Sequence, residues 1–191
     1  MSSGTCAFYS NCTSTPPTGV SAGTLTISGG NIGTGVAVMP GTGNQYNYTS
    51  AATFSPGQTL TVTASGATVP AFGPQSVTAP AVAVLTVPAA TSGTYMISTA
   101  ADLSLVWTGG QAGAQLIVEG TSTGSPQSYF TCTWDASLGQ ATVPHAILAG
   151  LAGQTNGYLV YGQFTTTNFM AGGYSISESA LPFAGGMANY Q

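Results

Sequence analysis

Apolar and polar side chains alternate in short runs along most of this 191-residue chain. In residues 102–110 the large side chains of Leu103, Leu105 and Trp107 alternate with other residues, so an extended backbone would place all three on one face. Gly109-Gly110 ends that run, and a second apolar run follows. The pattern predicts a strand, a turn and a returning strand, with Trp107 as the largest apolar group offered to a core.

Similar runs predict about ten short strands in all. The clearest is residues 59–65, where Leu60, Val62 and Ala64 alternate with hydroxyl residues. The other candidate strands are residues 24–28, 36–39, 46–48, 76–78, 82–87, 96–98, 115–119, 128–134, 158–165 and 174–178. One short helix is predicted over 144–151, with a proline at its first position.

Turn residues separate these runs about every 8–12 positions, which is typical of a β-sandwich. The predicted fold is therefore all-β, an Ig-like or Greek-key sandwich over residues 24–180, with an N-terminal arm (1–23) and a C-terminal tail (181–191). The length suits one domain. The residues predicted for its core are Leu60, Val62, Leu103, Leu105, Trp107, Phe130 and Trp134.

Charged side chains are nearly absent. The chain has no Lys or Arg and four acidic residues, so 2% of it is charged, against about a quarter in a typical domain. Without cations it cannot neutralise phosphates, which excludes nucleic-acid binding, and it has no lysine for a P-loop or a Schiff base. No apolar run reaches the ~18 residues of a spanning helix. A surface without charge repulsion favours self-association.

Three cysteines bear on the cellular compartment. Cys132 shares a strand face with Phe130 and Trp134, and the simplest pairing closes a small loop between Cys6 and Cys12. Pairing of Cys132 with one of the N-terminal cysteines, or a leftover thiol linking subunits, are the alternatives. With a single histidine, the cysteine spacing fits no metal motif, and we expect no metal or cofactor.

A set of core and turn residues runs through residues 54–178. It consists of Gly57, Leu60, Val62, Ser65, Gly66, Val69, Pro70, Phe72, Ala79, Pro80, Asp102, Leu103, Leu105, Trp107, Cys132, Gly139, Val143, Pro144 and Leu148. In these residues the chain resembles a group of secreted or cell-envelope proteins of myxobacteria that have no assigned activity. The resemblance implies an exported, surface-associated β-domain. Such proteins often look like lipoproteins, whereas here Cys6 follows other residues.

The residues that could carry catalysis are few. His145 is the only histidine, and no G-x-S-x-G motif accompanies it. The acids Asp102, Glu119, Asp135 and Glu178 are far apart in sequence. We therefore predict no enzyme and no catalytic residue. Two N-x-[ST] motifs and many Thr and Ser residues leave attached glycans possible.

Aromatic side chains gather in the predicted arms, and they suggest how the protein works. Apolar, uncharged arms could add a strand to a neighbouring subunit, or they could pack on their own domain. The candidate assembly residues are Phe8, Tyr9, Leu25, Ile27, Phe183 and Tyr190. The leading hypothesis is an extracellular or cell-surface structural protein, exported with its signal removed, that assembles with itself into a filament, fibre or layer. The alternative is a monomeric surface module that binds carbohydrate or peptide.

Overall fold

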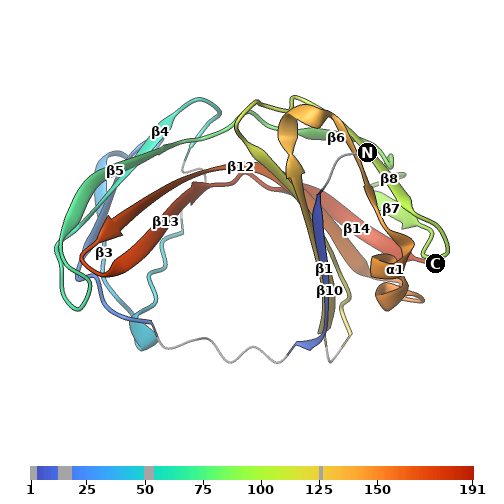
Figure 1. The fold of residues 1–191 in the computed structure, drawn as a ribbon, viewed down its shortest axis with the longest axis horizontal. Helices are drawn as coiled ribbons and strands as arrows, with labels where there is room; N and C mark the ends of the chain where they lie inside the picture. Colours follow the sequence, from blue (N-terminus) through green and yellow to red (C-terminus); the bar gives the residue numbers. More distant parts are fainter. Residues whose placement is uncertain (1–3, 13–18, 50–53, 125–126) are drawn as a thin grey trace. The chain divides into compact units, whose positions relative to one another are not determined.

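The described part of the chain folds into three β-sheets and one short helix, and 54% of the described residues lie in strands. This computed structural model describes residues 4–12, 19–49, 54–124 and 127–191. They form two compact units (Figure 1). Unit 1 comprises Met1–Ser14, Ala81–Phe164 and Leu181–Gln191, and unit 2 comprises Thr15–Pro80 and Thr165–Ala180.

The division follows one long strand, β12 (Gly157–Ala171). Its first part pairs with β9 and β14 of unit 1, and its second part pairs with β13 of unit 2. Each part therefore contributes to a different hydrophobic cluster.

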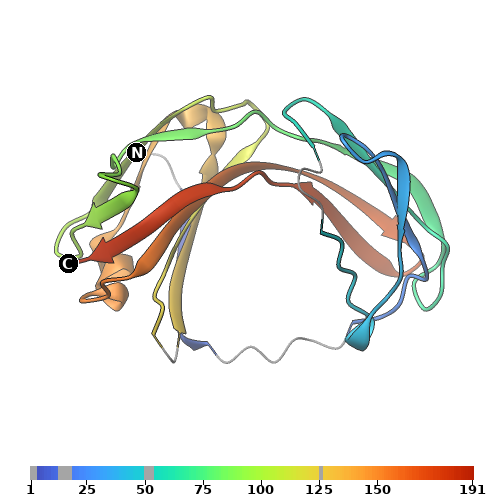
Figure 2. The same cartoon turned by 180° about the vertical axis from the view of Figure 1, so that it is seen from behind.

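Unit 1 contains two sheets. One has the strand order β1 (Thr5–Cys12), β10 (Gln127–Asp135), β9 (Gln115–Thr121), β12, β14 (Ala184–Tyr190) and β7 (Thr94–Ile97). The other has the order β11 (Gln140–Val143), β8 (Leu103–Thr108) and β6 (Val84–Val87). Between strands lie the helix α1 (His145–Leu148) and two 3-10 turns, Ala136–Leu138 and Ala149–Leu151. The C-terminal strand β14 runs parallel to β7 (Figure 2).

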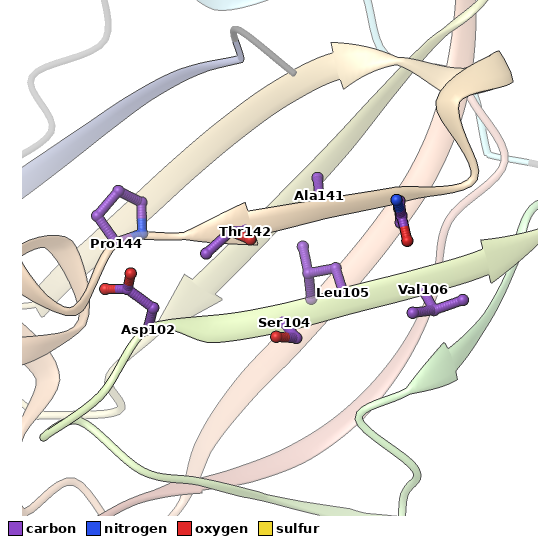
Figure 3. Close-up of a pocket in the computed structure, with 8 residues that line it drawn as sticks. Asp102, Ser104, Leu105, Val106, Ala141, Thr142 and Pro144 are labelled. Atoms are coloured by element: carbon purple, nitrogen blue, oxygen red, sulfur yellow. The ribbon is translucent and has the colours of Figure 1, made fainter. Parts of the chain in front are cut away.

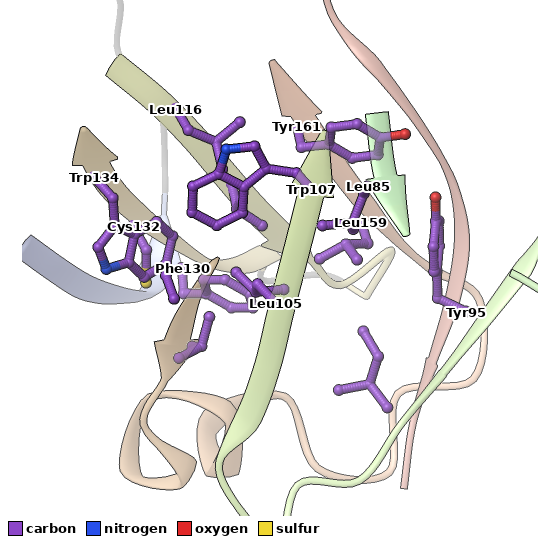
Figure 4. Close-up of a cluster of buried hydrophobic side chains, with 14 of the residues drawn as sticks. Leu85, Tyr95, Leu105, Trp107, Leu116, Phe130, Cys132, Trp134, Leu159 and Tyr161 are labelled. Atoms are coloured by element: carbon purple, nitrogen blue, oxygen red, sulfur yellow. The ribbon is translucent and has the colours of Figure 1, made fainter. Parts of the chain in front are cut away.

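The core of unit 1 lies between these two sheets (Figure 4). Leu105 and Trp107 of β8 belong to one buried cluster with Phe130 and Trp134 of β10, and Leu103 packs against it. The Trp107 Nε1–H donates a 2.7 Å hydrogen bond to the Ala136 carbonyl oxygen. All the residues predicted for the core between positions 103 and 134 thus contribute to it, because the alternation within each strand places them on one face.

Unit 2 combines a four-stranded sheet with a hairpin. The sheet order is β3 (Gly33–Val38), β2 (Leu25–Gly29), β4 (Thr59–Ala64) and β5 (Phe72–Thr78), and the hairpin joins the second part of β12 to β13 (Tyr174–Ala180). A 3-10 turn, Thr42–Asn44, follows β3.

Two small apolar clusters hold unit 2 together. The first contains Ala22, Ala64, Val69 and Ala171 with Leu25, Tyr46, Phe72 and Ile176 packed on it, and the second contains Val77, Ala79 and Ala180 with Phe54 and Leu60. Among the predicted core residues, Leu60 is half-buried, and Val62 is half-buried outside both clusters. The predicted strand 46–48 is not a strand. There the Tyr46 hydroxyl donates to the Gly23 carbonyl oxygen at 2.7 Å.

Each predicted arm contains one strand of unit 1, β1 in the N-terminal arm and β14 in the C-terminal tail. In β1, Phe8 lies opposite Phe130 and packs against the core. In β14, which lies between β12 and β7, Tyr190 is buried and its hydroxyl donates to the Tyr158 carbonyl oxygen at 2.8 Å. The described parts of both arms thus pack on their own chain. Burying these rings within one chain avoids the entropy cost of association.

The disulfide also differs from the preferred pairing. Cys6 bonds to Cys132 instead of Cys12, across a sequence separation of 126. The two cysteines are direct partners in the register of β1 and β10, which brings them together. The pairing of Cys132 with an N-terminal cysteine, held open by the sequence, is the one that forms. The side chain of Cys12 lies outside the described residues.

In the described residues, no helix is both long and apolar enough to cross a membrane.

Candidate functional site

A hollow of about 710 Å³ lies against the three-stranded sheet (Figure 3). Its lining comes from β8, β11 and the residues next to them: Asp102, Ser104, Leu105, Val106, Gln140, Ala141, Thr142 and Pro144. The register of β8 and β11 places Ser104 beside Thr142, so hydroxyl groups and the Gln140 amide line the hollow together with the Asp102 carboxylate.

Asp102 and His145 form the one ion pair among the described residues. The backbone N–H of His145 donates to the Asp102 Oδ1 at 2.8 Å, and the His145 Nδ1 lies 3.2 Å from the same oxygen. These hydrogen bonds, chiefly the backbone one, hold the pKa of Asp102 below its usual value. Both side chains are more than half exposed, at 57% for Asp102 and 62% for His145.

The geometry of this pair suits a structural role. Asp102 immediately precedes β8 and accepts hydrogen bonds from the first residue of α1, so it links the starts of the two elements. Among the described residues, no serine or threonine hydroxyl is hydrogen-bonded to His145. A Ser-His-Asp arrangement needs that contact.

The remaining acids differ in their surroundings. The Asp135 carboxylate accepts from the hydroxyl of Ser137 at 2.7 Å and from its backbone N–H at 2.9 Å, and both bonds lower the pKa of Asp135. Burial raises the pKa of Glu119, and it raises that of Glu178 to about 7. Across the part of the chain that is described, no three His, Cys, Asp or Glu residues gather as a metal site would require.

One row of aromatic and hydroxyl residues crosses the large sheet of unit 1. Residues directly opposite one another in register are Tyr9 on β1, Tyr129 on β10, Thr121 on β9, Tyr158 on β12 and Met187 on β14. We call these five residues the tyrosine row. Opposed residues in antiparallel strands project to the same face, so the row is continuous across five strands.

The face that carries the row is the one turned away from the core. The residue that follows or precedes each member of the row in its strand projects to the opposite face, where Phe130, Leu159 and Ala188 are fully buried. Gly120 lies in that inner layer because a Cβ there would meet the Phe130 ring at 2.2 Å. On the outer face the exposed fractions are 43% for Tyr9, 47% for Tyr158 and 42% for Met187.

Tyr9 is among the assembly residues predicted from the sequence, and the other four members of the row are not. A local signal existed, since Tyr129 precedes Phe130 in an alternating run and must face away from the core. The alignment of Tyr129 with Tyr158 depends on the register of three strands, which the local pattern does not contain.

The sheet edges share a second property. In the described chain the strands that pair on one side only are β1, β3, β5, β6, β7, β11 and β13. Glu178 of β13 is the only charged residue among them, and its carboxylate oxygens are buried. On and beside β6, three valines are exposed: Val82 at 46%, Val84 at 50% and Val87 at 43%.

Among the predicted assembly residues, Phe183 is 56% exposed, and Leu25 and Ile27 are half-buried on β2, between β3 and β4. No protein-family model matches the sequence, and a search of curated proteins finds no significant relative.

Proposed function

We propose that the chain is an exported structural protein that assembles with itself through uncharged sheet edges. The observation that carries the proposal is the absence of outward charge on the one-sided strands of the described chain. Monomeric proteins protect such edges with charged residues, especially lysine, because unpaired backbone groups otherwise recruit another chain.

The edge at β6 is the best candidate for the contact. Val84 and Val87 are both exposed on it, and β6 pairs only with β8 among the described strands. A second copy adding a strand here would satisfy the free backbone groups and cover the valines.

Export is supported by the disulfide between Cys6 and Cys132, because such bonds persist in oxidising compartments. The resemblance to secreted and cell-envelope proteins agrees with it. For the fold, we propose that the two sheets of unit 1 form an Ig-like or Greek-key sandwich, a proposal supported by the shared core between them.

The assembly proposal is tested with two lysine variants of the full chain. Val84→Lys places a charge on the β6 edge, and Thr155→Lys places the same charge on an exposed loop of the same unit. Sedimentation velocity and electron microscopy are expected to show assemblies for the wild type and for Thr155→Lys. For Val84→Lys they are expected to show particles of about the 18.9 kDa chain mass.

Two results would contradict the proposal. A wild type that stays monomeric at every concentration removes self-assembly and leaves the monomeric binding module. Assemblies that Val84→Lys does not weaken remove the β6 edge as the contact.

A further inference from the structure

The tyrosine row has the dimensions and chemistry of a binding platform. The rings of Tyr9 and Tyr129 are stacked, with centroids 4.8 Å apart and planes at 20°. Neighbouring strands lie about 4.8 Å apart, so the row from β1 to β14 extends over roughly 19 Å. That length accommodates several rings of a linear ligand lying across the strands.

We propose that the tyrosine row binds a neutral polysaccharide chain laid across β1, β10, β9, β12 and β14. Sugar rings present C–H groups on their faces and hydroxyls at their rims. Tyrosine rings pack against the C–H groups of the sugar faces, while tyrosine and threonine hydroxyls exchange hydrogen bonds with the sugar hydroxyls. The row offers both kinds of group, with two adjacent tyrosines on β1 and β10, Thr121 on β9 and a third tyrosine on β12.

The next row of the same face supplies a hydrogen-bond acceptor. Glu119 lies two residues from Thr121 on β9, opposite Thr131 on β10 and Val160 on β12. Residues two apart on a strand share a face and are separated by about 7 Å. The Glu119 carboxylate can therefore accept from sugar hydroxyls beside the row, as an ionised carboxylate has only acceptor groups.

Charge decides which glycans fit. The chain has no Lys or Arg, and the charged residue beside the row is acidic, so a polyanionic glycan would meet repulsion without compensation. Neutral polysaccharides meet none.

Position argues for a glycan over a peptide. Extended peptides bind sheets mainly by adding a strand at an edge, where backbone groups are free. The row instead runs inward from the edge strand β1 across β10, β9, β12 and β14, which each pair on both sides, so side chains must provide the affinity over most of its length.

Exposure also points to a ligand. Three tyrosines and a methionine follow one line on a chain whose other solvent-facing strand positions are chiefly small or hydroxyl residues. The buried core of unit 1 is on the opposite face of the same strands, so these side chains are not part of it.

The test is a binding screen of the full chain. The probes are soluble cello-, xylo-, manno-, malto- and chito-oligosaccharides in calorimetry and the matching insoluble polysaccharides in pull-down. Alginate serves as the polyanionic comparison and an unrelated extended peptide as the peptide comparison. We expect binding to at least one neutral series and none to alginate or the peptide.

Variants then locate the site. Tyr158→Ala is expected to weaken binding about tenfold, and Tyr9→Ala by several-fold, because each removes one stacking surface. Tyr158→Phe keeps the ring and is expected to retain most of the affinity. Tyr174→Ala is the matched control, since Tyr174 is an exposed tyrosine on β13 of unit 2. Thermal melting checks that each variant folds.

The proposal is overturned if no neutral glycan binds, if only alginate or the peptide binds, or if Tyr158→Ala and Tyr174→Ala weaken binding equally. Repeating the titration with Val84→Lys separates this proposal from the assembly proposal, because the row lies on the other sheet and its affinity for a short oligosaccharide should not change.

Discussion

Glu178 is the one charged residue of unit 2, and its surroundings do not suit a charge. It lies on β13 between Ile176 and Ala180, which pack into the two apolar clusters of the unit. Both carboxylate oxygens are buried, and no donor among the described residues reaches them. Burial accordingly raises the pKa of Glu178 to about 7. Asp102 and Asp135 show the opposite case, since their hydrogen bonds lower the pKa.

This residue makes stability depend on pH. The folded state holds the proton up to about pH 7, whereas the unfolded chain releases it near 4.5. The stabilisation is therefore complete below pH 4.5 and is lost as pH rises through 7. We expect the free energy of unfolding to fall by roughly 1–2 kcal/mol between pH 5 and pH 8, allowing for partial solvent contact.

Urea unfolding at the two pH values measures this difference. Glu178→Gln cannot ionise and is expected to flatten the pH dependence. Asp135→Asn is the control, because the pKa of Asp135 is lowered and it stays ionised over this range. An unchanged slope in Glu178→Gln would show that another group is responsible.

Among the elements, β12 carries one buried side chain, Gln163, that is hydrogen-bonded to the segments next to β6 and β8. Gln163 is fully buried. Its Nε2 donates to the carbonyl oxygens of Ala81 and, at 2.9 Å, Gly109, while its Oε1 accepts from the backbone N–H of Gln111 at 3.0 Å. One amide thus satisfies three backbone groups in the segments flanking β6 and β8.

Replacing that amide should be costly. Gln163→Leu leaves these three backbone groups without partners, and we expect a loss of about 3 kcal/mol in the free energy of unfolding. Gln140→Leu, at an exposed position of β11, makes the same chemical change and should have little effect. Equal losses from chemical denaturation of the two variants would contradict the assigned role of Gln163.

Local patterns predicted elements well and their partners poorly. The alternation around Trp107 and Phe130 identified β8, β10 and their buried faces, because the alternation within one strand is enough to tell which side chains share a face. Whether Phe8 and Tyr190 dock on their own chain or on another depends on pairing between distant segments, which no local pattern encodes. The disulfide and the alignment of the tyrosine row depend on the same registers, and so does the division of β12 between two cores.

At the scale of the whole molecule, stability depends little on charge and strongly on burial and cross-linking. The single ion pair of the described chain is exposed, and such pairs contribute little. The disulfide joins residues separated by 126 positions, and long loops gain most from such a bond in the chain-entropy view.

Removing the disulfide should therefore lower the stability of the protein substantially. We expect Cys132→Ser to lower the free energy of unfolding by about 3–5 kcal/mol, and the reduced wild type to behave alike. Cys12→Ser keeps the bond between Cys6 and Cys132 and serves as the control. Melting curves with and without reductant measure the effect, and a wild type indifferent to reductant would refute it.

The same bond determines how far the molecule can be stretched. A pulling force applied between the chain ends passes from Cys6 directly to Cys132, so residues 7–131 bear none of it. At about 3.5 Å per residue the oxidised chain would extend to roughly 230 Å, and the reduced chain to roughly 670 Å. In a fibre under tension, this one covalent link would limit extension to about a third of the chain's length and keep β8, β9 and the four-stranded sheet out of the line of force.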